Sequence, residues 1–347
     1  MTTSTSDTTR TDLGTPGFGL HPLHGIHEPT RGTPPRLPGS VRRTSSIDMT
    51  RDPGSLDPVY LLGRARDLKT ARDGTATEIG QAWMQATVEM IPRVIQHIEV
   101  APAVPGMRLV GAPAMRGFRA AVDKAAPQLR LRRDLRYTLL DDVPVATLIS
   151  GHALSASGAL GNVSKSGYLP VAYQCAGFVT GGLLMTSFEA GDPAVVTGPA
   201  APDLEDPADP LAWHDMATLP VLGMRRRRRL DVYRSQKNRE VLIDAMFRDT
   251  YVRADGTQTI IHEYTLEASV DPETDTIVRS AAVPRVLPWQ ECPGAVASAT
   301  RITGMKLGEL HFRVRRELSG TSTCTHLNDL LRSIADAAAL TPMLHTV

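Results

Sequence analysis

Gly223-Met-Arg-Arg-Arg-Arg-Arg-Leu-Asp231 opens the stretch of sequence that decides the fold. Three segments rich in Val, Ile and Thr follow it, and they span Glu240–Asp249, Thr257–Asp271 and Thr276–Val286. Ala254-Asp-Gly256 and Asp271-Pro-Glu273 separate them and are typical of turns between strands. The stretch therefore predicts about four antiparallel strands.

The pattern after these strands is helical. Leu307–Leu318 and Leu327–Leu340 carry apolar residues at helical spacing, and Gly320 ends the first of these segments. Pro293–Thr303 predicts a shorter helix with a proline at its start. The second half of the chain is thus predicted as a sheet followed by about three helices.

The same order of elements is predicted earlier in the chain, after a similar opening at Gly39–Asp48. The predicted strands of this first half are Ser40–Met49, Val59–Asp67, Ile79–Met90 and Val94–Ala101. Its predicted helices are Ala114–Ala125, Leu131–Leu140 and Val145–Ser157. Leu139-Leu-Asp141 and Leu327-Asn-Asp329 fall at corresponding places in the two halves. We therefore predict an α+β fold of two similar halves, produced by internal duplication or, alternatively, similar by chance.

These segments divide the chain into four regions. Residues 1–36 are predicted to be a disordered arm, and residues 37–160 and 223–341 are the two halves. Residues 161–222 hold an apolar segment and a connector in which prolines give stiffness and acidic side chains keep the chain solvated. The arm carries His21, His24 and His27, which we interpret as solvated side chains rather than a metal clip.

Composition restricts the class of protein. The 38 basic and 37 acidic residues leave a net charge of +1, which gives no global field for binding nucleic acid or an anionic membrane. The three cysteines lie far apart and cannot form a paired disulfide framework, so we predict a reducing compartment, the cytoplasm. Met1–Asp12 lacks the apolar core of a secretory signal. Tyr168–Phe188 has no charge but is interrupted by Pro and Gly, so we favour a buried connector over a membrane helix. The predicted partner is a small molecule, and a homo-oligomer is left open.

Cys324-Thr-His326 is the most distinctive group of chemically active residues. It precedes the last apolar stripe, which places it at a helix N-terminus where Thr323 or Thr325 would be the N-cap. The helix dipole would lower the pKa of Cys324, and His326 would exchange a proton near neutral pH. These residues are therefore candidates for a nucleophile and an acid or base. In the structural alternative the threonine caps the helix, the cysteine is packed and the histidine bonds to a carbonyl.

His262 and Glu263 are neighbours in a predicted strand, so their side chains point to opposite faces. Only one of them can share a site with Asp249, and we assign that role to His262. The alternative is a strand histidine whose hydrogen bonds are satisfied within the core.

Cys292, Cys324, His262 and His326 together match the inventory of a zinc site. The sequence has no CxxC pair, however, and C-x-H is unusual spacing for structural zinc, so we predict no metal. The chain also lacks a GxGxxG, a Gly-Lys-Ser/Thr phosphate loop and a Gly-x-Ser-x-Gly. No nucleotide or other cofactor is therefore predicted.

The arginines of Arg225–Arg229 alternate along a predicted strand, so about half of them face each way. One set would pair with Asp231, Asp244 or Asp249, and the other would receive a carboxylate or phosphate. The predicted substrate-binding residues are Arg227, Arg229, Trp289 and Asn328. The run is isolated and has no interleaved aromatic residues, so nucleic-acid binding is not favoured.

The second half resembles a bacterial family known only as a domain of unknown function, DUF2889. The resemblance covers about 120 residues, from Met224 to Leu340. It rests on Arg225–Arg229, Phe247-Arg-Asp-Thr250, Ile261-His-Glu263, Glu291-Cys-Pro-Gly294, Gly320 and, most specifically, Cys324-Thr-His-Leu-Asn-Asp-Leu-Leu331. The family commonly has Asp where this chain has Glu263, which keeps the charge. The resemblance implies a fold and a site location, but no reaction.

The two halves differ at the candidate site. When Asp141 is aligned with Asp329, Arg136 falls opposite Cys324 and Thr138 falls opposite His326. The first half thus lacks the thiol and the imidazole, and we expect the chemistry in the second half.

The function predicted from these residues is a cofactor-independent enzyme that acts on a small aromatic or acyl-type organic acid. Its predicted catalytic residues are His326, Cys324, His262 and Asp249. Lyase, isomerase and hydrolase chemistry all suit this set. The alternative is a non-catalytic protein that binds a small molecule or takes part in an assembly.

Overall fold

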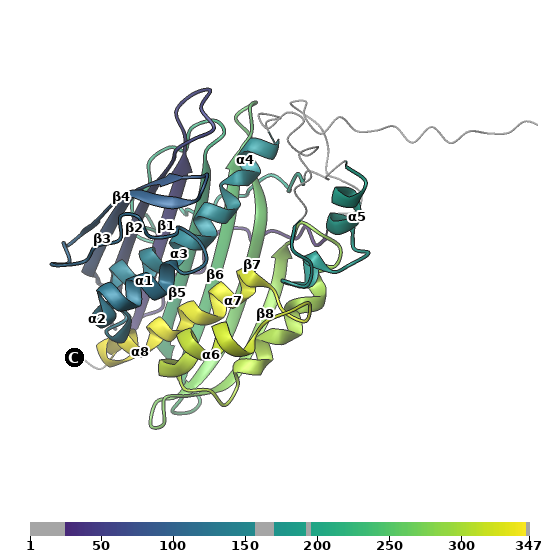
Figure 1. Cartoon of the computed structure of the whole chain (residues 1–347). Helices are drawn as coiled ribbons and strands as arrows, with labels where there is room; N and C mark the ends of the chain where they lie inside the picture. The colour runs from purple at the N-terminus through teal and green to yellow at the C-terminus, as the bar shows by residue number, and fades with distance from the viewer. Residues whose placement is uncertain (1–24, 157–169, 192–195, 345–347) are drawn as a thin grey trace, which may run out of the picture.

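Two halves, each with four antiparallel strands followed by helices, form a single eight-stranded sheet (Figure 1). The structure is a computed structural model that describes residues 25–156, 170–191 and 196–344. The strands are β1 (Ser40–Thr50), β2 (Val59–Thr70), β3 (Ala76–Glu89), β4 (Val94–Ala101), β5 (Met224–Arg234), β6 (Val241–Val252), β7 (Gln258–Asp271) and β8 (Thr276–Val286). Their order across the sheet is β4-β3-β2-β1-β5-β6-β7-β8. The predicted α+β class and the two similar halves are confirmed.

The halves meet at the centre of the sheet, where β1 pairs antiparallel with β5 and Ser45 lies opposite Arg228. The hairpins on either side correspond closely. Asp67 lies at a register shift between β2 and β3, and Asp249 lies at the matching shift between β6 and β7. Each aspartate also lies opposite an arginine of the central strand, Arg43 or Arg226. The two halves are thus related by an approximate twofold axis through the β1–β5 pair.

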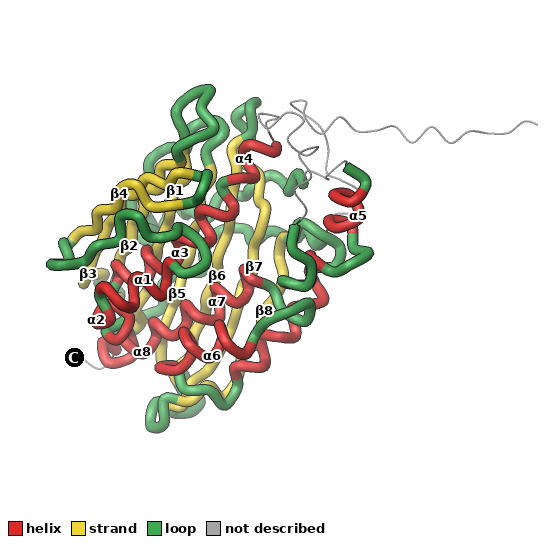
Figure 2. The backbone as a smooth tube through the Cα atoms, in the orientation of Figure 1, coloured by secondary structure: helices red, strands yellow, loops and turns green. Residues whose placement is uncertain are grey.

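Helices cover one face of the sheet (Figure 2). The α-helices are α1 (Phe118–Ala125), α2 (Pro127–Leu131), α3 (Leu135–Ile149), α4 (Gly151–Ala156), α5 (Leu183–Glu189), α6 (Leu310–Glu317), α7 (Thr325–Ser333) and α8 (Ala337–Leu340). The 3-10 helices are η2 (Ala176–Phe178), η3 (Cys292–Ile302), η4 (Leu307–Glu309), η5 (Ile334–Asp336) and η6 (Thr341–Leu344). The helices pack mainly on strands of their own half and form two apolar cores, one with Phe118 and Leu139, the other with Phe247 and Leu327. The first core also takes in Tyr251 of β6.

The predicted helices need corrections in both halves. Leu307–Leu318 is η4 followed by α6, and Pro293–Thr303 is the 3-10 helix η3. The predicted helices Leu131–Leu140 and Val145–Ser157 are instead joined across Pro144 into α3, followed by the short α4. The predicted helix Leu327–Leu340 is divided into α7, η5 and α8. The last two differences arise because packing against the sheet, rather than local periodicity, determines where these helices bend or end.

The second face of the sheet is covered by residues 25–38 and 196–222. Leu204, Ala212 and Trp213 are buried against Met246 of β6, and the Trp213 indole Nε1 donates to Oγ1 of Thr33 at 2.8 Å. The prediction of a disordered arm is therefore wrong for residues 25–36. The connector of residues 196–222 exposes acidic side chains such as Asp203 and Asp206, as expected for a solvated segment, but it also packs on the sheet. Polar composition alone did not predict this packing, because the segments supply hydrogen-bond acceptors to buried charged side chains of the sheet.

Arg42 shows this directly. Its guanidinium is buried, pairs with Asp231, and donates to the backbone carbonyls of Pro34 and Ala212. The arm also reaches the edge strand β8, where Glu28 N donates to Arg285 O at 2.7 Å. Of the three arm histidines, His21 and His24 lie outside the described residues, whereas His27 is partly buried, and burial lowers its pKa.

The apolar segment Tyr168–Phe188, from Pro170 onward, contains η2 and part of α5 rather than one long helix. It packs on the second half, where Ala176 N donates to Thr323 O at 2.9 Å. Within the described residues, no helix has both the length and the apolar character needed to cross a membrane.

Candidate functional site

Three polar side chains of the second half converge on the helix-covered face of the sheet. They are Asp249 from β6, His262 from β7 and His326 from α7. One nitrogen of each imidazole and one carboxylate oxygen all lie within 4.8 Å of one another. The two imidazole rings stack with their centroids 3.7 Å apart and their planes 21° apart. The structure brings these three of the sequence-predicted site residues together, without Cys324.

Local structure explains how each of them is placed. Asp249 and His262 are a cross-strand pair of β6 and β7, so their side chains lie on the same face of the sheet. His326 lies in the first turn of α7, which runs over that face, and its ring also stacks on Phe247 at 6.4 Å. The site is therefore held by regular elements rather than by a loop.

Asp249 is fully buried and is paired with Arg226, whose Nη1 donates to both carboxylate oxygens at 2.8 and 2.9 Å. Burial alone would raise the pKa of this carboxyl, but the Arg226 charge and the neighbouring imidazoles of His262 and His326 together lower it. His262 Nδ1 lies 3.3 Å from Asp249 Oδ2 without meeting the geometry of a hydrogen bond. Asp249 is thus a carboxylate anion beside an imidazole.

His326 is the second imidazole of the site. Burial, and next the proximity of His262, lower its pKa well below the usual value, so its ring is neutral near pH 7. Its Nε2 is buried and has no hydrogen-bond partner among the described residues. This nitrogen can accept a hydrogen bond or bind a cation. The lowered pKa does not agree with the predicted proton exchange of free His326 near neutral pH.

A network of buried ion pairs lies beneath the site and joins the two halves. Arg228 donates to Asp142 of α3 from Nε at 2.6 Å and to the backbone carbonyl of Asp329 in α7. Arg332 Nη2 bridges Asp141 of the first half and Asp329 of the second at 2.9 and 2.6 Å. The predicted landmarks Asp141 and Asp329 therefore meet, and they fix α3 and α7 over the sheet.

The site has partial access to solvent. The side chain of His262 is 12% exposed, and His326 and His152 are half-buried. His152 belongs to α4 and packs edge-on against Tyr251 of β6 at 5.3 Å. Burial and the proximity of His262 lower the pKa of His152 to about 4. The sequence prediction missed His152, since only the tertiary packing of α4 brings it near.

The first half has the same architecture without this chemistry. Asp67 lies opposite Gly80, as Asp249 lies opposite His262. Arg43 binds both oxygens of Asp67 and also donates to Thr138, the residue that corresponds to His326. A Cβ at Gly80 would lie 3.2 Å from Leu135, so apolar packing fills the space of the second imidazole. Thr138, which the sequence aligns with His326, therefore contacts the arginine of the first half's arginine–aspartate pair.

Cys324 does not join the imidazoles, and the prediction of a lowered thiol pKa is wrong. Burial, and next the proximity of Cys175, raise its pKa to about 12, although backbone N–H groups of Leu327 and His326 oppose the shift. The thiol lies beside the hydroxyl of Tyr264. Cys175, Cys292 and Cys324 are all free and buried. These thiols are protonated near neutral pH, so Cys324 is unsuited to act as a nucleophile.

The predicted threonine cap is also wrong. Cys324 itself is the N-cap residue of α7, and Thr323 donates its hydroxyl proton to Gly320 O at 2.8 Å. Asn328, a predicted substrate-binding residue, donates from Nδ2 to Leu318 O at 2.9 Å. It ties α7 to the end of α6.

Arg227 and Arg229 lie on the face of the sheet opposite the imidazoles, because Arg226 and Arg228 occupy the helix-covered face. Arg229 pairs with Asp231 and Asp244, as predicted for one set of arginines. Arg227 Nη1 binds Glu205 at 2.6 Å, and its guanidinium lies 5.9 Å from the Trp213 ring centre. The prediction missed that the arginines nearest the site are Arg226 and Arg228. The available signal was the alternation along the strand, which puts Arg226 and Arg228 on one face, with Arg226 opposite Asp249 in the hairpin.

Trp289 is likewise placed away from the predicted substrate site. It packs against the segment at Gly177, where an added Cβ would lie 2.9 Å from the indole, and against the second apolar core. Its role in the described structure is to hold η2 against η3.

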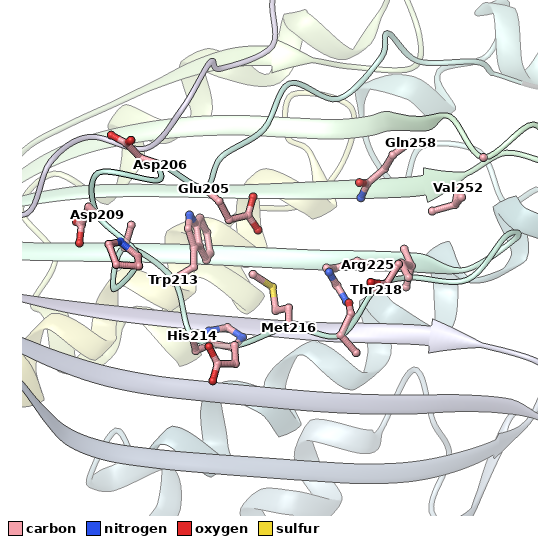
Figure 3. Close-up of a pocket in the computed structure, with 16 residues that line it drawn as sticks. Glu205, Asp206, Asp209, Trp213, His214, Met216, Thr218, Arg225, Val252 and Gln258 are labelled. Atoms are coloured by element: carbon pink, nitrogen blue, oxygen red, sulfur yellow. The ribbon is translucent and has the colours of Figure 1, made fainter.

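A separate pocket of about 450 Å³ lies on the second face of the sheet, beneath the connector. Figure 3 shows Trp213, His214 and Met216 of the connector and Arg225 of β5 among the side chains that line this pocket. His214 is buried between the hydroxyls of Ser46 and Thr44, and burial lowers its pKa to about 3. Asp249, His262 and His326 are not among the residues that line this pocket.

Comparison with known proteins places the site within a family. No curated protein matches the chain. Among solved structures, a lipopolysaccharide binding protein aligns with 86% of this chain and 92% of its own length, at 7% identity and a TM-score of 0.13. That likeness is too slight to carry an argument. Residues 224–340 match the family described as "Protein of unknown function (DUF2889)". The C-terminal half, which contains Asp249, His262 and His326, is therefore a DUF2889 family domain.

Proposed function

We propose that this protein is an enzyme that acts on a small organic molecule by proton transfer at Asp249, His262 and His326. The observation that carries the proposal is the meeting of two imidazoles, from a strand and a helix, at one fully buried carboxylate. Imidazole is the side chain most often used for general acid–base catalysis. A carboxylate beside an imidazole orients it and stabilises its protonated form.

The first half supports a functional rather than a structural role for the imidazoles. It builds the same sheet and the same arginine–aspartate pair with Gly80 and Thr138 at the corresponding positions. The architecture therefore does not require histidine there. His262 and His326 each bury one ring nitrogen without a hydrogen-bond partner among the described residues. Such burial costs about 1–3 kcal/mol per atom, so these imidazoles are poor choices for packing alone.

The reacting groups that we propose are fewer than those expected from the sequence. Cys324 is left out because its thiol is buried and protonated. Arg227 and Arg229 are paired on the opposite face, so they do not support an organic acid as substrate. The aromatic or acyl-type acid therefore stays a prediction, as does the choice among lyase, isomerase and hydrolase.

The cellular setting also stays a prediction. A reducing cytoplasm suits three free, buried cysteines. A small-molecule partner also stays a proposal, and we propose no nucleic-acid or membrane partner. A homo-oligomer is left open.

The second candidate is a protein that binds a small molecule without converting it. The 450 Å³ pocket beneath the connector favours this function, because its volume suits a small ligand and it lies across the sheet from the imidazoles (Figure 3). Trp213 and Met216 supply apolar contact surface there, and Arg225 and Gln258 supply polar groups.

An untargeted metabolite screen distinguishes the two functions. The full chain is incubated with a bacterial small-molecule extract, and substrate loss and product gain are followed by mass spectrometry. His262→Asn and His326→Asn are run in parallel, with His97→Asn, on an exposed position of β4, as the matched control. We expect conversion by the wild type and by His97→Asn, and its loss in both site variants.

Other outcomes contradict the enzyme proposal. Conversion that persists in folded His262→Asn and His326→Asn places the chemistry elsewhere. Retention of a metabolite without conversion, lost in Trp213→Ala but kept in His326→Asn, supports the binding function instead.

A further inference from the structure

We propose that Asp249, His262 and His326 bind a divalent transition-metal ion, with Zn²⁺ as the best match to the three donors. The sequence predicted no metal, because the set considered there contained cysteines without a CxxC pair. In the structure the two histidines lie beside the carboxylate of Asp249 instead of beside the cysteines. The inference goes beyond the proposed reaction, since metal binding is measurable without a substrate.

The donor set is that of a metal site that keeps open positions. Catalytic zinc sites have three protein ligands and a water, and a pair of histidines with one carboxylate is a recurring set. The same set with open positions also holds non-haem iron. Thiolates, which mark closed structural zinc sites, are absent from the three donors.

The spacing of the donors fits one ion. Zn–N and Zn–O bonds of about 2.0–2.2 Å in a tetrahedron place neighbouring ligand atoms about 3.4 Å apart. His262 Nδ1 and Asp249 Oδ2 are already 3.3 Å apart. The His326 nitrogen lies within 4.8 Å of both donor atoms, and the stacked rings hold the imidazoles side by side. Because the two rings stack nearly parallel, with centroids 3.7 Å and planes 21° apart, their in-plane lone pairs do not meet at one point, so binding of one ion requires the His326 ring to turn out of the stack.

The two imidazoles each have a nitrogen that no described residue satisfies. His262 Nδ1 and His326 Nε2 are both buried and lack a hydrogen-bond partner among the described residues. Burying these two nitrogens without hydrogen-bond partners costs free energy. A cation bound between them and the carboxylate would interact favourably with all three groups. This pairing of orphaned nitrogens distinguishes the group from an ordinary acidic cluster.

The residues behind the carboxylate act as outer-shell support. Arg226 Nη1 donates to both oxygens of Asp249 and fixes the orientation of the carboxylate. Arg226 is itself neutralised, because Asp142 lies 3.5 Å from its Nε and Asp329 lies 3.9 Å from its Nη2. An ion beside Asp249 therefore does not face an unbalanced guanidinium.

The first half again provides a comparison within the chain. Both oxygens of Asp67 are taken by Arg43 through Nε and Nη2, and Gly80 and Thr138 supply no imidazole. The inference is thus confined to the second half. If an ion binds, a water on it would lose a proton near neutral pH, because a metal lowers the pKa of bound water to about 7, and the resulting hydroxide would be the base in place of the coordinated imidazoles.

Titration of the full chain tests the inference. Protein freed of metal with a chelator is titrated with Co²⁺, followed by visible absorption, and with Zn²⁺, followed by equilibrium dialysis and elemental analysis. We expect one ion per wild-type chain. Loss of an outer-shell partner alone weakens metal sites about 10–100-fold, so His262→Asn and His326→Asn should each weaken binding at least about 10-fold.

Two controls keep the result specific. His21→Asn/His24→Asn removes arm histidines whose spacing also suits a metal, and it should bind the ion as tightly as the wild type. Circular dichroism and thermal unfolding confirm that each variant is folded.

Absence of stoichiometric Co²⁺ and Zn²⁺ binding by the folded wild type would overturn the inference. So would binding that is lost with the arm histidines but kept in folded His262→Asn and His326→Asn. Metal binding without any conversion of metabolites would instead contradict only the proposed reaction.

Discussion

The imidazole of His262 lies flat against that of His326, with ring centroids 3.7 Å apart, although one residue belongs to a strand and the other to a helix 64 positions later (326 − 262). Asp249, the cross-strand neighbour of His262, completes the group. The corresponding positions of the first half hold an aspartate without either imidazole. The second half therefore has two imidazoles beside its aspartate, whereas the first half repeats the architecture without them.

Replacing Asp249 with Ala is expected to destabilise the fold. Arg226 is fully buried and makes its two carboxylate hydrogen bonds to this residue, so its charge would lose its main partner. Breaking a buried pair in this way costs about 3–5 kcal/mol. The free energy of unfolding in urea measures the effect, and a loss below about 1 kcal/mol would show that Asp142 and Asp329 suffice to hold Arg226.

The stability of the protein should fall in acid through the network that joins the halves. Burial opposes ionisation of Asp141, but Arg119 and Arg332 hold its pKa well below the usual value. Its folded pKa is thus depressed, and its contribution is present above the unfolded value of about 3.9 and is lost as pH falls through the folded pKa. Urea unfolding between pH 7 and strongly acidic pH should show stability decreasing below about pH 4.

Asp141→Asn provides the control for the acid dependence. It should be less stable at pH 7 but should lose less further stability in acid, since the titrating group is gone. An unchanged pH dependence in Asp141→Asn would assign the acid sensitivity to other carboxyl groups. Asp336, whose pKa burial raises, contributes in the opposite direction.

The three thiols should be unreactive in the folded protein. Cys175, Cys292 and Cys324 are buried, and burial raises the pKa of each. A disulfide reagent at pH 7 should modify no thiol of the folded chain on a timescale of seconds and all 3 after denaturation. Cys324→Ala should keep full turnover. Rapid modification of the folded chain, accompanied by loss of turnover, would restore Cys324 as a reacting group.

Trp213 should anchor the connector without serving the imidazole site. Its side chain is 3% exposed and packs with Leu204 and Met246. Trp213→Ala should lower stability by about 3–5 kcal/mol in urea unfolding, as expected for a large buried side chain. Turnover per folded molecule should stay at the wild-type level. A parallel loss of turnover would connect the pocket beneath the connector to the reaction.

The strands and part of the site could be predicted because they depend on local rules. Alternation along β7 and the turn residues that bound it fixed which face His262 shares with Asp249. The repeat of elements predicted the two halves, and Thr138 as the counterpart of His326. These features follow from periodicity and spacing alone.

Features that depend on tertiary packing could not be predicted in the same way. Cys324 begins α7 as expected, but the burial of that helix end, which raises the thiol pKa, depends on how α7 meets β7 and the segment at Cys175. The connector and the arm are polar in composition, and only the buried charges of the sheet, such as Arg42, explain why they pack. The ion pairs of Arg227 and Arg229 likewise required the structure.

We propose that the two similar halves differ in function, because only the second holds the imidazoles. The most direct test compares turnover of one substrate by His326→Asn and by Thr138→Ala, its counterpart in the first half, per folded molecule. We predict that His326→Asn lowers kcat/KM about 100-fold or more, the range of a lost acid–base group, while Thr138→Ala stays near the wild type. Equal losses in the two variants, or full turnover in His326→Asn, would contradict the account.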